Sequence, residues 1–328
     1  MSRKRRFVLG SLGVGLVLAL ALFAVGSSRE RPMGPTGRWL VAAGLEPRFE
    51  NLAGRRVRFV RKGAGPAMVL LHGFASSIYT WKDVLPVWAR DHDVVAVDLP
   101  GFGQSECPPG LSSEEYPAVV IGLLDRLGLS RATLVGNSMG GAVAATVAAQ
   151  RPDRVDRVVL IDAAGFNLEE KKRPWPIRVV GSGPVSAVLE KLPLRRLLVE
   201  ASLKQVFFDD ALVTPERIDE YLEPLLRPSA SPAIRSLLAS RALHPGAVQQ
   251  LLPQITAPVL ILWGRQDEWI PVADAARFAS ALPGSRTALL DQCGHTPQEE
   301  KPMDVVRIVE EFAPGDSAAG KDLAEHPE

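Results

Sequence analysis

The sequence contains little cysteine: Cys107 and Cys293 are the only two among 328 residues. One possible pair does not make a disulfide framework, so the chain is not a small domain held together by disulfides. We expect two independent, small apolar side chains, although the sequence leaves their pairing open. The length is ample for a sizeable hydrophobic core, in one large domain with an insertion or in two small domains.

The chain also has no excess of charge of one sign, because 38 Lys and Arg residues stand against 37 Asp and Glu residues. Proteins that bind nucleic acids usually carry a basic excess, so nucleic acid is not an expected partner. The sequence shows no cluster of metal-ligand residues, no internal repeat and no glycine-rich phosphate-binding loop. We therefore expect neither a metal nor a cofactor, and local motifs have to indicate the function.

The start of the chain combines a basic cluster with a long uncharged run. Residues 3–6 are all basic, and residues 7–26 are apolar over a length that can cross a hydrocarbon layer about 30 Å thick. Basic residues before such a run favour a cytoplasmic N-terminus. We expect residues 1–28 to be a membrane anchor that holds the rest of the chain on the extracytoplasmic side. A signal peptide cleaved near Ala24-Val25-Gly26 would instead release a secreted protein, and three glycines disfavour a buried soluble helix.

Residues 29–50 are rich in proline, glycine and charge, which predicts a linker. After it, short apolar runs alternate with stretches of helical length, such as residues 113–127 and 139–150. The predicted strands are residues 56–61, 68–71, 94–97, 132–135, 158–161, 259–263 and 287–290. Continuous aliphatic runs suit strands that are buried on both faces. The pattern predicts an α/β fold with a mostly parallel central sheet flanked by helices.

One stretch interrupts this alternation. Residues 166–250 show helical segments and many prolines but no clear strand, which predicts a helical cap inserted between two late strands. The core is then divided into residues 51–165 and 251–313, and the small, polar residues 314–328 predict a disordered tail. Apolar residues that can form one side of the cap are Leu192, Leu194, Leu197, Leu198, Phe207 and Phe208. The two phenylalanines are the candidate substrate-binding residues.

A nucleophile motif follows the predicted strand at 132–135. Residues 136–140 read Gly-Asn-Ser-Met-Gly, which matches G-x-S-x-G in a strand–turn–helix context. The turn is so tight that side chains at Gly136 and Gly140 would clash with neighbouring backbone. It lifts Ser138 clear of the sheet, at the start of a helix with unpaired amide N–H groups. Ser138 is therefore the candidate nucleophile.

A serine nucleophile needs a base, and the base needs a supporting acid. His295 follows the last predicted strand and is the well-placed base among five histidines. Asp267 follows the strand at 259–263 and belongs at the same sheet edge, so it is the candidate acid. Asp162, at the end of the strand at 158–161, is its rival.

The reaction also needs two N–H donors that stabilise the oxyanion. One is the amide of Met139, directly after the nucleophile. The other comes from the loop after an early strand, where Leu71-His72-Gly73-Phe74 makes Phe74 the candidate donor. Gly73 allows the backbone to come close to a substrate, and we interpret His72 as structural.

These motifs together resemble the α/β-hydrolase superfamily over residues 50–313. The resemblance rests on His72-Gly73-Phe74, on Asp98-Leu99-Pro100-Gly101-Phe102-Gly103-Gln104-Ser105, on Gly136-Asn137-Ser138-Met139-Gly140-Gly141 and on Gly294-His295, in that order. It implies the α/β-hydrolase fold, with the cap between the sixth and seventh core strands, and it does not specify a substrate. Asn137 and Gly141 are similar to meta-cleavage-product hydrolases, which cut carbon–carbon bonds. The same Gly-Asn-Ser-Met-Gly-Gly string also resembles esterases and lipases of the superfamily. The serine argues against dehalogenases and epoxide hydrolases, which carry aspartate at this position.

We expect a serine hydrolase that cleaves a carboxylic ester or acylglycerol through a Ser138–His295–Asp267 triad and an acyl-enzyme. Three alternatives stay open: a carbon–carbon hydrolase of vinylogous diketones, a cofactor-free perhydrolase or acyltransferase, and a non-catalytic binding protein. The sequence does not give the acyl chain length or the oligomeric state.

Overall fold

The computed structural model describes residues 37–166, 195–239 and 245–313. Its centre is one sheet of eight strands in the order β1-β2-β4-β3-β5-β6-β7-β8. The β1–β2 and β2–β4 pairs are antiparallel, and all later pairs are parallel. The strands are β1 (Arg48–Leu52), β2 (Arg55–Lys62), β3 (Ala67–Leu71), β4 (Asp93–Val97), β5 (Ala132–Asn137), β6 (Val155–Ile161), β7 (Val259–Gly264) and β8 (Arg286–Leu290). The predicted α/β class with a mostly parallel sheet is confirmed.

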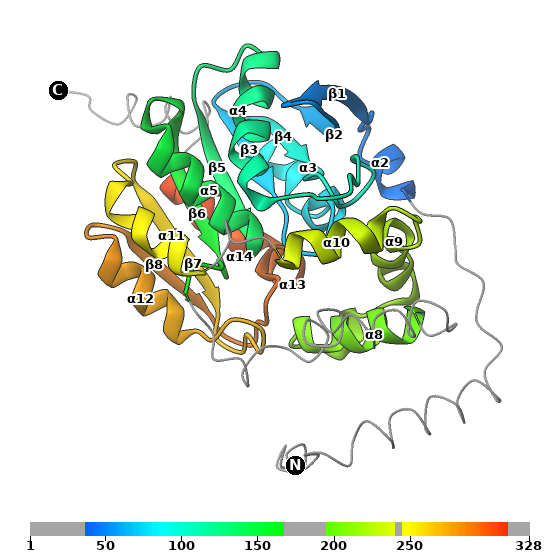
Figure 1. Cartoon of the computed structure of the whole chain (residues 1–328). Coiled ribbons are helices and arrows are strands. Elements are labelled where there is room, and N and C mark those ends of the chain that lie inside the picture. Colours follow the sequence, from blue (N-terminus) through cyan, green and yellow to red (C-terminus); the bar gives the residue numbers. More distant parts are fainter. Residues whose placement is uncertain (1–36, 167–194, 240–244, 314–328) are drawn as a thin grey trace, which may run out of the picture.

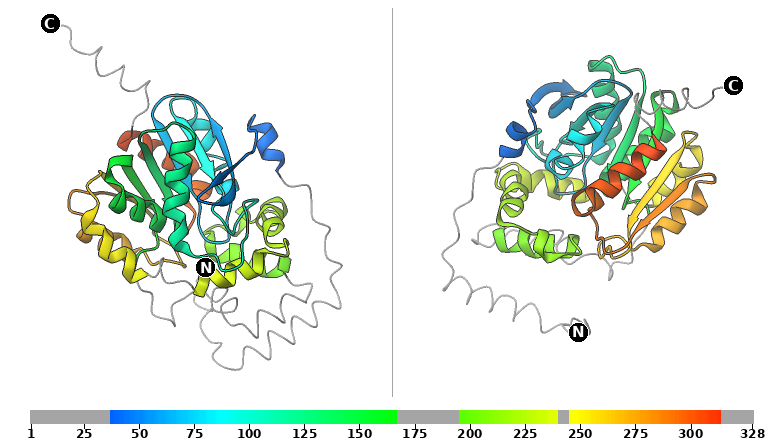
Figure 2. Two further views of the ribbon diagram at one scale, coloured as in Figure 1. Left: turned by 45° about the horizontal axis from the view of Figure 1, so that its top comes forward. Right: turned by 180° about the vertical axis from the view of Figure 1, so that it is seen from behind.

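Helices cover both faces of this sheet. The helices are α2 (Arg38–Ala42), α3 (Leu85–Trp88), α4 (Tyr116–Arg126), α5 (Met139–Gln150), α8 (Arg195–Val206), α9 (Pro215–Leu225), α10 (Ala230–Ala239), α11 (Pro245–Leu251), α12 (Ala273–Ala281), α13 (Pro297–Glu300) and α14 (Pro302–Phe312). Short 3-10 turns include η1 (Ile78–Trp81), η2 (Ser113–Glu115), η3 (Pro152–Arg154), η5 (Asp210–Leu212) and η6 (Leu252–Gln254). Helices α4, α5, α11 and α12 lie in front of the sheet in Figure 1, and the view from behind in Figure 2 shows α14 on the other face.

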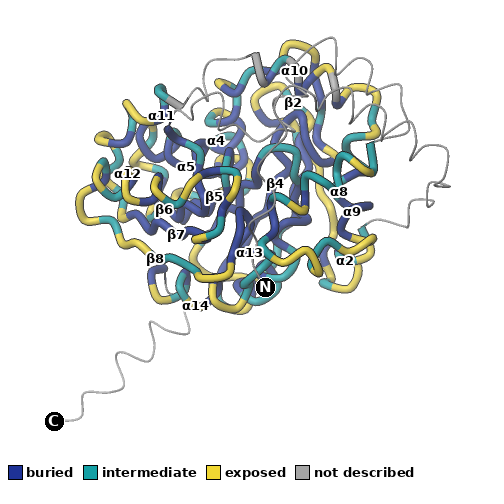
Figure 3. The backbone as a smooth tube through the Cα atoms, turned by 90° about the horizontal axis from the view of Figure 1, so that it is seen from below, coloured by how far each residue is buried: buried dark blue, intermediate teal, exposed yellow. Residues whose placement is uncertain are grey.

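The alternation of side chains along the strands explains why two apolar layers form. In β3, Val69 and Leu71 belong to the cluster under α4, α5 and α12, whereas Met68 and Leu70 belong to the cluster under α3 and α14. Every residue of β4, β5 and β7 is buried, and the strands appear dark blue in Figure 3. Full burial on both faces is what continuous aliphatic runs predict.

The linker prediction for residues 29–50 is wrong from Arg38 onward. Residues 38–42 form α2, and Arg48–Leu52 form an edge strand paired with β2. Leu40 and Leu45 are buried in the same apolar cluster as Trp81, so this segment is part of the core. Its strand was missed because its side chains are mostly exposed at the sheet edge, which weakens the apolar pattern.

Three cap helices, α8, α9 and α10, follow β6 and lie together at one end of the sheet (Figure 1). They pack partly on each other, with Leu203, Val206, Phe207 and Ile218 in one small apolar cluster. Helix α11 packs instead on the core helix α5, so the end of the cap lies before Pro245 and not at residue 250. Helix α10 joins the cap to the core, because its buried Ala233, Ile234 and Leu237 belong to the main apolar cluster. Polar contacts add to this, since Arg227 donates to the carbonyl oxygens of Gly103 and Ser105.

Several predictions fall outside the described residues. They are the anchor or signal at 1–28, the tail at 314–328, and Leu192 and Leu194 of the cap. Within residues 37–166, 195–239 and 245–313, no helix combines the length and the apolar character needed to cross a bilayer.

Candidate active site

Ser138 lies in the tight turn between β5 and α5, with φ 54° and ψ −117°. This conformation is uncommon for a residue with a side chain, and it costs of order 1–3 kcal/mol unless the surroundings hold it. Three backbone hydrogen bonds hold it here. The Ser138 N–H donates to the Ile161 carbonyl (2.9 Å), and the Ser138 carbonyl accepts from Gly141 (3.0 Å) and Ala164 (2.9 Å). The serine is thus fixed at the N-terminus of α5, half-buried.

The two glycines that flank the serine are required by packing. A Cβ on Gly136 would lie 2.2 Å from the Gly140 carbonyl oxygen, and one on Gly140 would lie 2.0 Å from the Leu71 carbonyl oxygen. Because the obstructing atoms belong to the backbone, they cannot move aside as a side chain can. The prediction that side chains at these positions would clash is confirmed, and the contact places the start of α5 directly beside the end of β3.

His295 and Asp267 contact each other directly. His295 Nδ1 lies 2.7 Å from Asp267 Oδ2, and both side chains are buried. The other carboxylate oxygen, Oδ1, accepts the backbone N–H groups of Trp269 (2.7 Å) and Ile270 (3.0 Å). With Nδ1 bound to Asp267, Nε2 is the ring nitrogen that can act as a base. The Trp269 ring stacks on the imidazole, with centroids 5.7 Å apart and planes 23° apart.

The loop that carries His295 is tied to the serine turn and to the cap. Asn137 donates its side-chain N–H to the His295 carbonyl oxygen (3.0 Å) and so joins the residue before Ser138 to the histidine loop. The His295 N–H donates to the carbonyl oxygen of Val206 at the end of α8 (2.8 Å). Neither contact was predicted, because each joins residues that are 89 or more positions apart in the sequence.

The loop after β3 approaches Ser138 closely. A Cβ on Gly73 would lie 3.2 Å from Ser138 Cβ, so the backbone that leads to Phe74 passes beside the nucleophile candidate. Met139 is the first residue of α5, and its N–H has no partner four residues earlier within the helix. The two predicted oxyanion donors therefore belong to segments that flank the serine.

His72 has a structural position. Its Nε2 accepts the Leu99 N–H (2.9 Å), so Nδ1 carries the proton that is donated to the Gly73 carbonyl oxygen (2.7 Å). Complete burial lowers the pKa of His72, which keeps the ring neutral. The imidazole links the ends of β3 and β4, as the structural interpretation of this residue predicts.

Asp162, the rival acid, ends β6 with φ 44° and is completely buried. Its Oδ1 accepts the Gly264 N–H (3.0 Å), and its buried Oδ2 has no hydrogen-bond donor among the described residues. The contact with His295 Nδ1 belongs to Asp267 and not to Asp162. Among the described residues, these three alone offer possible metal-ligand atoms within 4.8 Å of one another. A cation there would displace the proton between Nδ1 and Oδ2, so the arrangement fits proton transfer better than metal binding.

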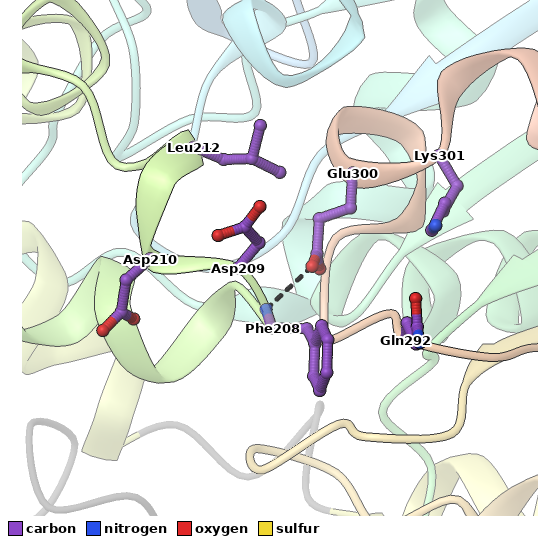
Figure 4. A pocket seen from close by; sticks show the side chains of 7 residues that line it. All are labelled: Phe208, Asp209, Asp210, Leu212, Gln292, Glu300 and Lys301. Atoms are coloured by element: carbon purple, nitrogen blue, oxygen red, sulfur yellow. Dashed lines mark hydrogen bonds between the residues drawn. The ribbon is translucent and has the colours of Figure 1, made fainter. Parts of the chain in front are cut away.

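The two cap phenylalanines lie in different environments. Phe207 is buried in the apolar cluster of the cap, and the Arg217 guanidinium lies 4.7 Å from its ring centre. Phe208 lines a cavity of about 450 Å³ (Figure 4). The other residues of that cavity are Asp209, Asp210, Leu212, Gln292, Glu300 and Lys301, and Ser138 is not among them. Their predicted contact with substrate stays a prediction.

Sequence reasoning also missed Glu300, which links the cap to the histidine loop. Its carboxylate accepts the Gly294 N–H (2.9 Å) and the Phe208 N–H (2.7 Å), the latter drawn as a dashed line in Figure 4. Burial raises the pKa of Glu300 to about 7. Cys107 and Cys293 are both buried and free, which confirms two independent thiols.

Comparison with known proteins identifies the family. The family model of the alpha/beta hydrolase fold matches residues 66–302. An uncharacterized hydrolase of Bacillus subtilis is 31% identical over 75% of this chain and 89% of its own length. A 2-hydroxy-6-oxo-2,4-heptadienoate hydrolase of Pseudomonas putida is 30% identical over 84% of this chain and 95% of its own.

Solved structures agree with this result. A meta-cleavage product hydrolase from Pseudomonas fluorescens is 25% identical, with a TM-score of 0.71 over 81% of this chain and 96% of that one. A membrane phospholipase A is also 25% identical, with a TM-score of 0.72 over 92% and 96%. The match to the family model, the sheet order and the serine turn lead to one conclusion: the chain belongs to the α/β-hydrolase fold family.

Proposed function

We propose that this protein is a serine hydrolase that cleaves a carboxylic ester or an acylglycerol. The observation that carries the proposal is the buried 2.7 Å contact of His295 with Asp267, in a loop tied through Asn137 to the strained turn of Ser138. A buried carboxylate that holds Nδ1 leaves Nε2 to take the proton of a serine hydroxyl. A merely structural serine has no need of this arrangement.

In the proposed reaction, Ser138 Oγ attacks the ester carbonyl carbon while His295 Nε2 removes the hydroxyl proton. The backbone N–H groups of Met139 and Phe74 stabilise the oxyanion, and Asp267 stabilises the imidazolium. His295 then protonates the departing alcohol. Water, activated by the same imidazole, attacks the acyl-enzyme and releases the acid.

The ester class is supported by the similarity to a membrane phospholipase A, which spans 92% of this chain. The sequence of residues 1–28 supports a related proposal, a membrane anchor with the catalytic domain on the extracytoplasmic side. Extraction of membranes with alkaline carbonate tests it, because an anchored chain stays in the pellet. A mature protein that begins after Gly26 would favour a cleaved signal and contradict the anchor.

A carbon–carbon hydrolase of vinylogous diketones is the second candidate. It is favoured by the 30% identity to the heptadienoate hydrolase, which covers 95% of that protein. The same three side chains would serve this reaction. A perhydrolase or acyltransferase would use the same acyl-enzyme with a different acceptor.

A series of p-nitrophenyl esters of increasing acyl length, run beside a dienol diketone on the full chain in mild detergent, separates these candidates. We expect ester turnover with an optimum in chain length, and a loss of at least about 10³-fold in Ser138→Ala. Diketone turnover with negligible ester turnover would overturn the ester class. Equal ester turnover by Ser138→Ala would overturn the mechanism.

A further inference from the structure

Asp162 has a feature that the proposed reaction does not use. Its side chain is completely buried beside the Asp267 carboxyl group. A carboxylate oxygen of Asp162, a carboxylate oxygen of Asp267 and a ring nitrogen of His295 all lie within 4.8 Å of one another. The position is rigid. The Asp162 N–H donates to the Leu262 carbonyl oxygen (3.0 Å), and Ala164, two residues later, donates to the Ser138 carbonyl oxygen (2.9 Å). The turn after β6 is therefore part of the frame that holds the site.

The two carboxyl groups differ in the hydrogen bonds that they accept. Asp267 accepts two backbone N–H groups and the His295 ring N–H, all of which stabilise its ionised form. Asp162 accepts a single N–H on Oδ1, and its buried Oδ2 accepts none from the described residues. Two adjacent buried carboxyl groups do not both ionise, so a shared proton belongs on the group with fewer donors.

The electrostatic surroundings of Asp162 point the same way. Burial raises its pKa well above the usual value, and the carboxylates of Asp267 and Glu300 raise it further. The other titratable groups around it are Cys293, whose pKa burial also raises, and the imidazole of His295. The backbone N–H of Gly264 opposes this shift but does not reverse its direction.

We propose that Asp162 is a positioning residue whose carboxyl group carries a proton at neutral pH and donates it from Oδ2 to the carboxylate of Asp267. This hydrogen bond satisfies the one buried oxygen of Asp162 that has no donor. It also fixes the Asp267 carboxylate and shares its negative charge. Only the effect of Asp162 on turnover rests on the proposed function. Its protonation state can be measured without turnover.

The first test is infrared difference spectroscopy of the full chain at pH 8, wild type against Asp162→Asn. The proposal predicts that wild type has the carbonyl stretching band of a neutral carboxylic acid and that the variant lacks it. Loss of carboxylate bands instead would mean that Asp162 is ionised and would overturn the proposal. This result is independent of whether the protein hydrolyses esters.

The second test uses the pH profile of kcat/KM for the best ester. Asp162→Asn keeps an N–H donor and should stay within about threefold of wild type, with the same acid limb. Asp162→Leu removes the donor and should lose about 10–100-fold, with an acid limb moved to higher pH, because the charge on Asp267 is no longer shared. Asp156→Leu, on the exposed end of the same strand, is the control and should behave as wild type.

Two kinetic results would overturn the proposal. A loss in Asp162→Asn as large as that in Asp267→Asn, about 10⁴-fold in a triad of this kind, would make Asp162 an ionised acid. Unchanged profiles in both Asn and Leu variants, with intact thermal unfolding, would make it a bystander. If Asp162→Leu does not fold, the Asn variant and the infrared spectra still decide. Absence of ester turnover in wild type contradicts the proposed function and leaves the infrared result valid.

Discussion

Glu300 offers the clearest link between pH and stability in this protein. Its carboxyl group is largely buried between the histidine loop and the end of α8, where it accepts N–H groups from Gly294 and Phe208. Burial raises its pKa from 4.5 to about 7. We predict that Glu300→Gln makes the protein less sensitive to pH in this range, because the glutamine side chain does not ionise.

The sign and size follow from proton linkage. An unfolded chain loses the Glu300 proton near pH 4.5, whereas the folded protein holds it to about pH 7. Between these values the folded state binds more protons, so this group stabilises the fold fully at low pH and less as the pH rises. The shift corresponds to about 3 kcal/mol in total. About 2.5 kcal/mol of it falls between pH 5 and pH 8.

The assay is urea unfolding of both proteins at pH 5 and pH 8. The difference in unfolding free energy, variant minus wild type, should become more positive by about 2–3 kcal/mol from pH 5 to pH 8. The hydrogen bond that glutamine cannot make lowers the variant's stability at both pH values and cancels in this comparison. Equal m-values show that both proteins unfold in the same way. A difference that stays constant with pH would refute the buried-carboxyl reasoning.

Two further predictions concern packing and a buried ion pair. Gly140→Ala places a Cβ 2.0 Å from a β3 carbonyl oxygen, so it should cost at least about 1–3 kcal/mol and reduce ester turnover more than tenfold. In Gly122→Ala, in α4, the added Cβ has no neighbour closer than 3.8 Å, so the unfolding free energy should rise by about 0.5–1 kcal/mol. Similar thermal unfolding of the Gly140→Ala and Gly122→Ala proteins would contradict the packing argument. Arg217→Leu leaves Glu299 buried without its cation (3.2 Å, side chains 7% and 0% exposed), which should cost about 3–5 kcal/mol in urea unfolding at pH 7. Arg131→Leu removes the exposed ion pair of Arg131 with Asp156 and should lower the unfolding free energy by less than about 1 kcal/mol. Equal losses in Arg217→Leu and Arg131→Leu would show that burial of the ion pair is not decisive.

The sequence predicts well those parts of the fold in which a short run of residues indicates how deeply that segment is buried. The aliphatic runs of β3 to β7 are largely buried, so each run identifies a strand without knowledge of its neighbours. Because the carboxyl ends of parallel strands meet at one edge, the order of strands and loops in the sequence predicts that Ser138, Asp267 and His295 lie together. Of this prediction, the structure shows the contact between Asp267 and His295.

What sequence did not predict depends on contacts between distant segments. The edge strand β1 was missed because its pattern is largely polar, and its pairing with β2 becomes evident only in the sheet. The bond from Asn137 to the His295 loop, the two N–H groups held by Glu300 and the contact of Asp162 with Asp267 all cross between separate loops. No local periodicity encodes such contacts, so the supporting residues of the site emerge only from the three-dimensional arrangement of the chain.

The most direct test of the central claim is covalent labelling of the folded full chain with a fluorophosphonate, followed by peptide mass spectrometry. The account predicts a single adduct on Ser138, formed at least about 100-fold more slowly in His295→Ala, because the serine then lacks its base. No adduct in folded wild-type protein, or an adduct on another residue, would contradict the assignment of Ser138 as the nucleophile.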